Sequence, residues 1–220
     1  MKTLVPLAAT VALAGCITFG AKPPPSLLTL TSTAQPAVGQ QQVAAVAPGT
    51  TASTLSVGGQ QLGTVTTTAV PAGSSSITIQ VPTVPQALAT ARVPVQATAT
   101  TIAYIKGAVW VEPPAQAFAR VLGDTVTART GRVVLSSAQS YQTGSAQLTG
   151  ELRQFGIDAA SQSAIVVYDA SLLRATGGGI AKQRFEAHVL VASVDAQGAG
   201  IGLNAAANQV AAEVADWVGR

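Results

Sequence analysis

Acid–base chemistry would need paired carboxylates, or a histidine beside a nucleophile, and the chain has few such groups. Four carboxylates lie in or at the ends of segments in which polar and apolar residues alternate: Glu151, Asp158, Asp169 and Glu186. His188, the single histidine, follows Glu186 by two residues. Alternation places such groups on the solvated side of a strand, and neither a serine elbow nor a cysteine nucleophile accompanies the histidine. The sequence therefore predicts surface charges and a protein that is not an enzyme.

Nucleotide, metal and nucleic-acid binding are not indicated either. Residues 177–179 are three glycines, but no Lys-Ser/Thr pair follows them and no helix begins there, so they do not form a phosphate-binding loop. One cysteine and one histidine cannot assemble a Cys/His metal cluster. The net charge of +3 arises from scattered groups, whereas a nucleic-acid footprint needs clustered lysines and arginines. We therefore expect no cofactor, no metal and no nucleic-acid partner.

The only cysteine, Cys16, carries the clearest chemical signal. It ends the sequence Leu13-Ala14-Gly15-Cys16, which follows Lys2 and an apolar run over residues 4–13 that is too short to span a bilayer of roughly 30 Å. The pattern resembles a bacterial lipobox, in which a diacylglyceryl group is attached to the thiol and cleavage leaves the cysteine as the first residue. The alternative is an ordinary secretory signal with a chance cysteine. We expect residues 1–15 to be a signal peptide and Cys16 to carry fatty acyl chains such as palmitate, since two or more chains give stable anchoring.

Residues 16–75 are predicted to form a lipidated N-terminus and a low-complexity tract. A proline run ends at Pro25, and residues 26–31 read as a short strand. No Asp, Glu, Lys or Arg occurs from Pro23 to Ala91. One interpretation of residues 33–75 is a loosely ordered linker; the other is a hairpin of strands 53–57 and 61–67 joined at two glycines. A third hypothesis is that this uncharged tract lies on a partner or a neighbouring subunit.

Residues 76–220 are predicted to form one compact domain. The segment around Trp110 is a strand that leads into a helix at Pro113, because a proline pair suits a first helical turn, and Gly131 is the expected stop. Apolar residues at helical spacing indicate a second long helix from Ala199 to Val218. Strands are expected at 77–81, 93–97, 102–111, 133–135 (short and buried), 146–155, 164–172 and 185–191, a helical turn at 85–91, and a hairpin turn at 177–179. The predicted fold class is α/β: a single layered domain, with a mixed sheet that ends in an antiparallel meander and two long amphipathic helices.

The ordered set of motifs resembles the ABC-type transport auxiliary lipoproteins, the family that includes the lipoprotein of the paraquat-inducible MCE system. The match comprises the lipobox, Leu27-Leu28-Thr29-Leu30, Ile79 to Pro82, Leu88, Arg92, Tyr104, Trp110-Val111-Glu112-Pro113-Pro114, Arg120-Val121-Leu122, Leu148 to Phe155, Arg184-Phe185, and the last helix from Leu203 to Trp217-Val218. The chain departs from the pattern in its long uncharged tract and in Gly107-Ala108, which lack the polar residues expected there.

This resemblance implies a lipid-anchored, periplasm-facing accessory of an MCE/ABC-type system that moves lipids between membranes. It implies an MCE-domain protein and its ABC permease and ATPase as partners, contact with the membrane through the lipid, and self-association as a further expectation. Ile17 rather than aspartate follows Cys16, which by the sorting pattern of such lipoproteins favours the outer membrane. A lipoprotein of envelope structure or outer-membrane assembly, without a transport role, is the alternative.

Three charged residues are candidate partner contacts, because charges are rare in this chain: Arg92, Glu112 and Arg153. We expect them to form a semi-buried charge network. Trp110, Phe155 and other characteristic aromatic residues read as core residues that set the fold.

Overall fold

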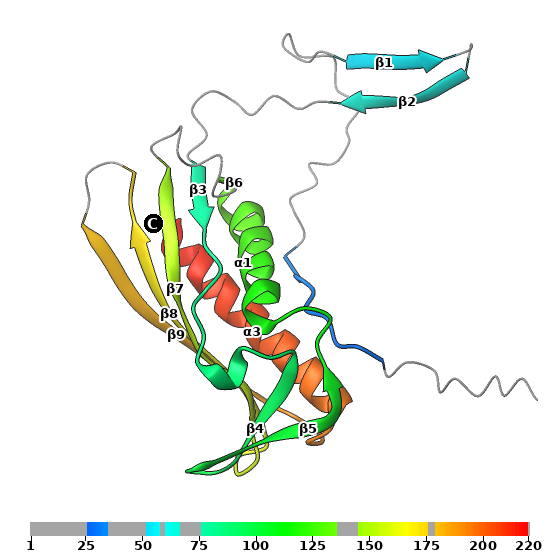
Figure 1. Ribbon diagram of the computed structural model, residues 1–220. Coiled ribbons are helices and arrows are strands. Elements are labelled where there is room, and N and C mark those ends of the chain that lie inside the picture. Colours follow the sequence, from blue (N-terminus) through cyan, green and yellow to red (C-terminus); the bar gives the residue numbers. More distant parts are fainter. Residues whose placement is uncertain are drawn as a thin grey trace, which may run out of the picture.

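A mixed sheet and a layer of two helices make up the domain (Figure 1). The computed structural model describes residues 26–34, 76–135, 145–175 and 179–219 in full, and residues 52–57 and 60–66 in their backbone. The domain elements are β3 (Ser76–Ile79), η1 (Gln86–Leu88), β4 (Arg92–Thr98), β5 (Thr101–Val109), α1 (Pro114–Thr130), β6 (Val133–Leu135), β7 (Ala146–Asp158), β8 (Ser163–Leu173), β9 (Ile180–Leu190) and α3 (Ala196–Val218). The predicted α/β fold class is confirmed.

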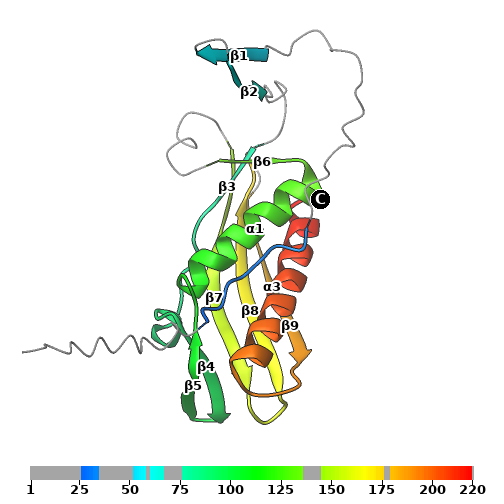
Figure 2. The same ribbon diagram turned by 90° about the vertical axis from the view of Figure 1, so that its right-hand side faces the viewer.

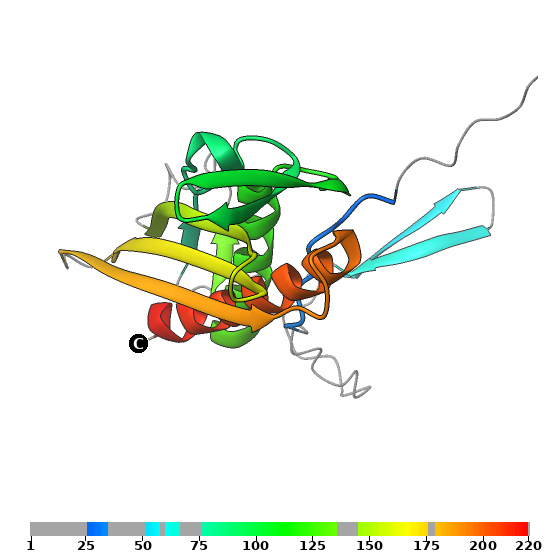
Figure 3. The ribbon, with the colours of Figure 1, turned by 90° about the horizontal axis from the view of Figure 1, so that it is seen from below.

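The long strand β7 organises the sheet. Along one edge it pairs with β8 in antiparallel register, and β9 pairs with β8 in turn. Its other edge carries two parallel strands, β3 beside its first residues and β4 beside its last. Parallel β6 lies outside β3, and antiparallel β5 lies outside β4. The expected C-terminal meander is therefore β7-β8-β9, and Figure 3 shows β9 as its outermost strand, on the side away from the β4–β5 hairpin.

Helix α1 begins and ends where its prolines and glycine predict. Pro113 has an extended backbone and precedes Pro114 in the first turn, where missing amide donors cost nothing. Gly131 adopts a left-handed conformation, with φ of +67°, and its N–H donates to the Thr127 carbonyl at 3.0 Å. The apolar stripe of α1, which includes Phe118, is fully buried.

Helix α3 begins three residues earlier than the apolar stripe indicated. The Asp195 side chain accepts a hydrogen bond from the Gly198 N–H at 2.8 Å, which makes Asp195 the N-cap. Glycines at 198, 200 and 202 had obscured this first turn. At Gly202 the helix comes so close to the sheet that a Cβ would lie 2.5 Å from a Val191 methyl carbon.

Three edge-to-face aromatic pairs hold the layers together. Each contributes about 0.5–1.5 kcal/mol beyond the apolar area that it buries. Phe118 of α1 meets Tyr168 of β8, Trp217 of α3 meets Phe185 of β9, and Trp110 meets Phe155 of β7, with ring centroids 5.3, 5.6 and 5.7 Å apart respectively. The aromatic residues singled out in the sequence therefore belong to the core.

Several local predictions need correction. Residues 26–31 form one isolated bridge, Leu28 with Trp110, instead of a strand, and β6 is half-buried rather than buried. The hairpin interpretation of the uncharged tract agrees with the structure, in which β1 (Ala52–Val57) and β2 (Gln60–Thr66) pair in antiparallel register. Their joining glycines lie outside the described residues, as do residues 176–178 of the expected turn.

Candidate functional site

An N-terminal arm, residues 26–34, lies along the helical layer between α1 and α3 (Figure 2). Leu28 starts this contact: its N–H donates to the Val109 carbonyl at 2.8 Å, and its carbonyl accepts from the Val111 N–H at 2.9 Å. Leu30 is fully buried in the domain core. The arm is therefore an integral part of the fold, although most of its length pairs with no strand in the described part of the chain.

Two asparagines of α3 take the place of a neighbouring strand. Asn204 and Asn208 are four residues apart and so share one face of the helix. The Asn204 Oδ1 atom accepts from the Thr31 N–H at 2.9 Å. The Asn208 amide accepts from the Thr33 N–H at 2.7 Å and donates to the Thr31 carbonyl at 2.9 Å. Backbone groups of an extended segment need such partners when they leave water, and this asparagine pair supplies them.

Helix α1 holds the arm from its other side. The Arg120 guanidinium donates to the Leu30 carbonyl at 3.2 Å, and the Ser32 and Thr125 hydroxyls lie 3.4 Å apart. Glu112 forms an ion pair with Arg120. Both charged side chains are partly exposed, so this ion pair contributes little to stability. Its effect is to orient the Arg120 guanidinium toward the arm.

The three predicted partner contacts lie in three separate places. Arg92 packs over the ring of Tyr104, with its guanidinium carbon 4.4 Å from the ring centroid. Glu112 pairs with Arg120 beside the arm, and Arg153 belongs to an ion-pair cluster on the sheet. The charge network that we expected among the three was therefore wrong. Each of the three has a partner closer along the chain than the other two candidates are: Glu112 pairs with Arg120, eight residues away, and Arg92 packs on Tyr104, twelve residues away.

The ion-pair cluster lies on the face of the sheet opposite the helices. Asp169 accepts two hydrogen bonds from Arg184, at 2.6 and 2.8 Å, and Arg153 approaches the same carboxylate at 3.4 Å. Glu151 lies 3.8 Å from Arg153. The hydrogen bond from Arg184 lowers the pKa of Asp169 below its ordinary value. A carboxylate held in its charged form suits ion pairing and is a poor proton donor at neutral pH.

A β-bulge places Arg153 in this cluster. The β7–β8 register shifts between Leu152 and Gln154, so that Arg153 is the extra residue. The shift reverses the alternation, and Phe155 faces the core where simple alternation would have put it outside. The signal was present in the sequence, because the apolar spacing changes from two to three between Leu152 and Phe155.

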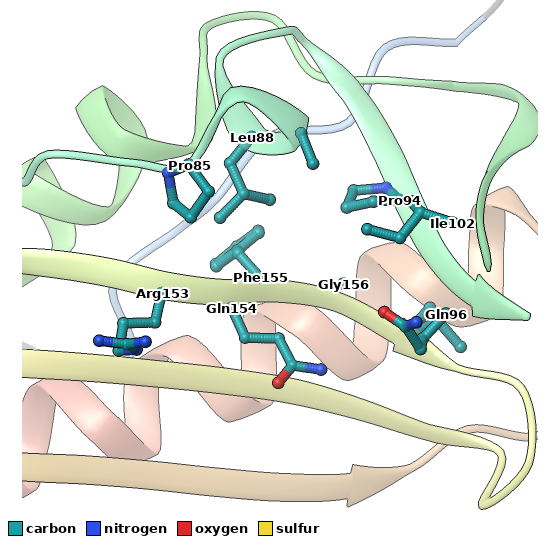
Figure 4. Close-up of a pocket in the computed structure, with 11 residues that line it drawn as sticks. Pro85, Leu88, Pro94, Gln96, Ile102, Arg153, Gln154, Phe155 and Gly156 are labelled. Carbon is teal, nitrogen blue, oxygen red and sulfur yellow. The ribbon is translucent and has the colours of Figure 1, made fainter. Parts of the chain in front are cut away.

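A pocket of about 210 Å³ lies next to the bulge (Figure 4). Pro85 and Leu88 come from the η1 segment, Pro94 from β4, and Phe155 points up between them from β7. Ligand pockets usually measure roughly 300–1,000 Å³. This space is smaller than such a pocket and matches the size of one apolar side chain better than that of a phospholipid.

Cys16 lies outside the described residues, so its modification stays a prediction. No group of three or more His, Cys, Asp or Glu side chains within residues 26–34, 76–135, 145–175 and 179–219 could hold a metal ion. Within the same ranges, none of the helices has both the length and the apolar content that crossing a bilayer requires.

Comparisons with known proteins agree with this fold. The chain is similar to a solved crystal structure of a Xanthomonas campestris protein of the family DUF330, with 20% identity, coverage of 66% of this chain and 84% of that chain, and a TM-score of 0.57. A second structure, of an uncharacterized protein, gives 15% identity, 66% and 93% coverage, and a TM-score of 0.58. No curated protein matches the sequence.

A family model matches most of the chain. Residues 59–215 match the model of the ABC-type transport auxiliary lipoprotein component. The matched range contains the whole seven-stranded sheet, helix α1, and helix α3 except for its last turn. Membership makes this chain an auxiliary lipoprotein component of an ABC-type transport system. The resemblance inferred from the motifs is thereby confirmed: the chain belongs to the family of ABC-type transport auxiliary lipoprotein components.

Proposed function

We propose that this protein is the lipid-anchored, periplasm-facing accessory of an MCE/ABC-type system for lipid transport between membranes. In this proposal Cys16 carries the lipid, the outer membrane receives it, and the folded domain holds or receives the MCE protein that conducts the lipid. The ABC permease and ATPase supply the energy. Self-association of the domain is part of the proposal.

The arm is the observation that carries the tethering role. Nine residues lie between Cys16 and Ser26, which makes ten steps along the chain, and a fully extended chain covers at most about 3.6 Å per step. The domain would therefore lie within roughly 36 Å of the bilayer surface. Leu28 is held by backbone bonds to Val109 and Val111 at the end of β5, and the arm beyond it is held by Asn204, Asn208 and Arg120. A pull on the lipid would therefore act first at the end of β5 and then on the helical layer.

A pull-down from crosslinked cell envelopes tests the proposal. A C-terminal tag would recover the MCE protein with the wild type, and Cys16→Ala would lose it if the lipid is required to reach the partner. Recovery with both forms would keep the transport role and restrict the lipid to localisation. Absence of an MCE protein from both would refute the transport role.

The second candidate function is that of an envelope-structure or outer-membrane assembly lipoprotein without a transport role. The same arm would suit any tether, so the partner decides between the two. An adjacent permease, ATPase and MCE gene would favour transport, whereas recovery of assembly factors with the tagged protein would favour the alternative.

A further inference from the structure

Strand β9 presents a long and regular free edge. It runs for eleven residues and pairs with β8 without any register shift, and in the described part of the chain no strand lies on its other side (Figure 3). The opposite edge, β5, differs: its pairing with β4 contains two register shifts, and Gly107 has a φ of +77°. Bulges are a usual means of protecting an edge from association. Strand β9 lacks this protection and contains no proline.

The hydrogen-bond pattern shows which residues face this free edge. The Val191 N–H donates to the Gln162 carbonyl at 2.9 Å, in the same register that pairs Leu190 with Ser163. Odd-numbered residues therefore bond to β8. Because donors and acceptors alternate in direction along an antiparallel strand, the even-numbered residues direct their N–H and C=O groups outward. These are Ile180, Lys182, Arg184, Glu186, His188 and Leu190.

The side chains of these residues are complementary to a second copy of β9. Consider two β9 strands that run antiparallel about a twofold axis at Phe185. Each residue then lies opposite the residue of the second copy that is equally far from Phe185 on its other side, so the two residue numbers add up to 370. Arg184 then faces Glu186 of the second copy, and the reverse, in two opposite-charge pairs. Ile180 and Leu190, which are 63% and 80% exposed in the monomer, oppose each other at both ends. Both kinds of cross-strand pair stabilise a sheet.

Neighbouring registers are less complementary than the register with its axis at Phe185. Opposed residues in a sheet must have their side chains on the same face, so the pairing can shift only by two residues at a time. Each such shift moves the twofold axis by one residue along the strand. An axis at Arg184 would pair Lys182 with Glu186 twice, but it would also oppose two arginines on the axis itself. An axis at Glu186 would oppose two glutamates. Like charges directly opposite are destabilising. Charge therefore selects the axis at Phe185 over both neighbours.

We propose that the β9 edge is the surface through which two copies of this chain associate, to form one continuous sheet with the twofold axis at Phe185. This inference deepens the self-association included in the proposed function and needs neither the lipid nor an MCE partner. In the monomer Arg184 donates two hydrogen bonds to Asp169 of β8, and Glu186 pairs with His188. Both side chains therefore lie on the face opposite the helices, and the pairs between copies would add to these contacts.

Distances between spin labels on single cysteines test the register. The mature chain with Cys16→Ser has no other cysteine, so labels at Ile180→Cys and Leu190→Cys are site-specific. With the axis at Phe185, the two labels of one dimer lie about ten residues apart along the strand direction, which is roughly 34 Å. The Ile180→Cys and Leu190→Cys dimers therefore give equal label-to-label distances. Labels at Lys182→Cys and His188→Cys give a second equal pair, near 20 Å. Unequal distances within either pair, or a monomeric mass in light scattering, would overturn the proposal.

Charge reversal tests the contacts. Glu186→Arg opposes two pairs of arginines and is expected to weaken self-association about tenfold or more, while Arg184→Glu with Glu186→Arg restores it. Arg153→Glu is the matched control, because it alters the same ion-pair cluster on β7, away from the edge, and should leave the dimer unchanged. Equal dimer affinity of Glu186→Arg and wild type refutes the interface. The pull-down with Cys16→Ala does not depend on this result, so each proposal can fail alone.

Discussion

Removal of the Asn208 side chain should release the arm. Asn208→Ala leaves the Thr33 N–H and the Thr31 carbonyl without partners at a site where Asn208 is only 9% exposed. Thr31 and Thr33 are themselves exposed, so water reaches these backbone groups, and each lost hydrogen bond costs about 0.5–1.5 kcal/mol. The loss cannot exceed what docking of the arm contributes, and burial of Leu30 alone is worth roughly 1.5–3 kcal/mol. We expect a loss of about 1–3 kcal/mol, which shifts the docking equilibrium by roughly 5- to 150-fold.

Hydrogen exchange of the peptide that contains residues 26–34 measures this shift. Its amides should exchange faster in Asn208→Ala. Amides of β7 and β8 should keep most of their wild-type protection, because the backbone bonds of Leu28 go to Val109 and Val111 and not to these strands. Gln209→Ala is the matched control, since the Gln209 side chain contacts Glu213 at 3.4 Å on the exposed side of α3. Unchanged arm exchange in Asn208→Ala would refute the role of the asparagine pair. Uniformly faster exchange across α3 and the sheet would show that Asn208 stabilises the helix instead.

Two further predictions concern the sheet. Gly202→Ala should destabilise the domain by about 1–3 kcal/mol in urea unfolding, because its Cβ would lie 2.5 Å from Val191, whereas at Gly200 the clashing atom ends a flexible leucine and the alanine variant should be nearly neutral. Asp169 has a lowered pKa in the folded state, so the stability that it contributes is present above its ordinary pKa of 3.8 and is lost as the pH falls through the lowered value. Asp169→Asn should flatten this acid dependence in unfolding curves measured from pH 5 to pH 2, and an unchanged slope would show that the pairing with Arg184 adds nothing.

Local signals in the sequence were sufficient to predict much of the fold. The proline pair before α1 and Gly131 after it fix both ends of this helix because they act on the backbone of the adjacent turn alone. Alternation located β7 and β8, although it ended β7 three residues early and missed the bulge at Arg153. These features depend on neighbours within a few residues, which a sequence shows directly.

The candidate site depends on long-range pairing, which the sequence did not show. Asn204 and Asn208 are separated from the arm by more than 170 residues, and an asparagine pair on an otherwise apolar helix resembles ordinary surface residues. The strand predicted at residues 26–31 was wrong for the same reason: its hydrogen-bond partners are mainly side chains of α3 and α1, and only Leu28 meets a backbone bridge. The change in apolar spacing at Arg153 was visible, yet only the pairing with β8 identifies it as a bulge.

The position of the arm also constrains how two copies can sit on a membrane. A twofold axis through Phe185 stands perpendicular to the continuous sheet, so both helical layers lie on the same face of the dimer. The arm contacts α1 and α3, and both arms would therefore leave the dimer on that one face (Figure 2). Two lipid anchors, each on at most about 36 Å of chain, could then enter one flat bilayer together. The opposite face, with the ion-pair cluster of Asp169 and Arg184, would point away from the membrane and be open to a periplasmic partner.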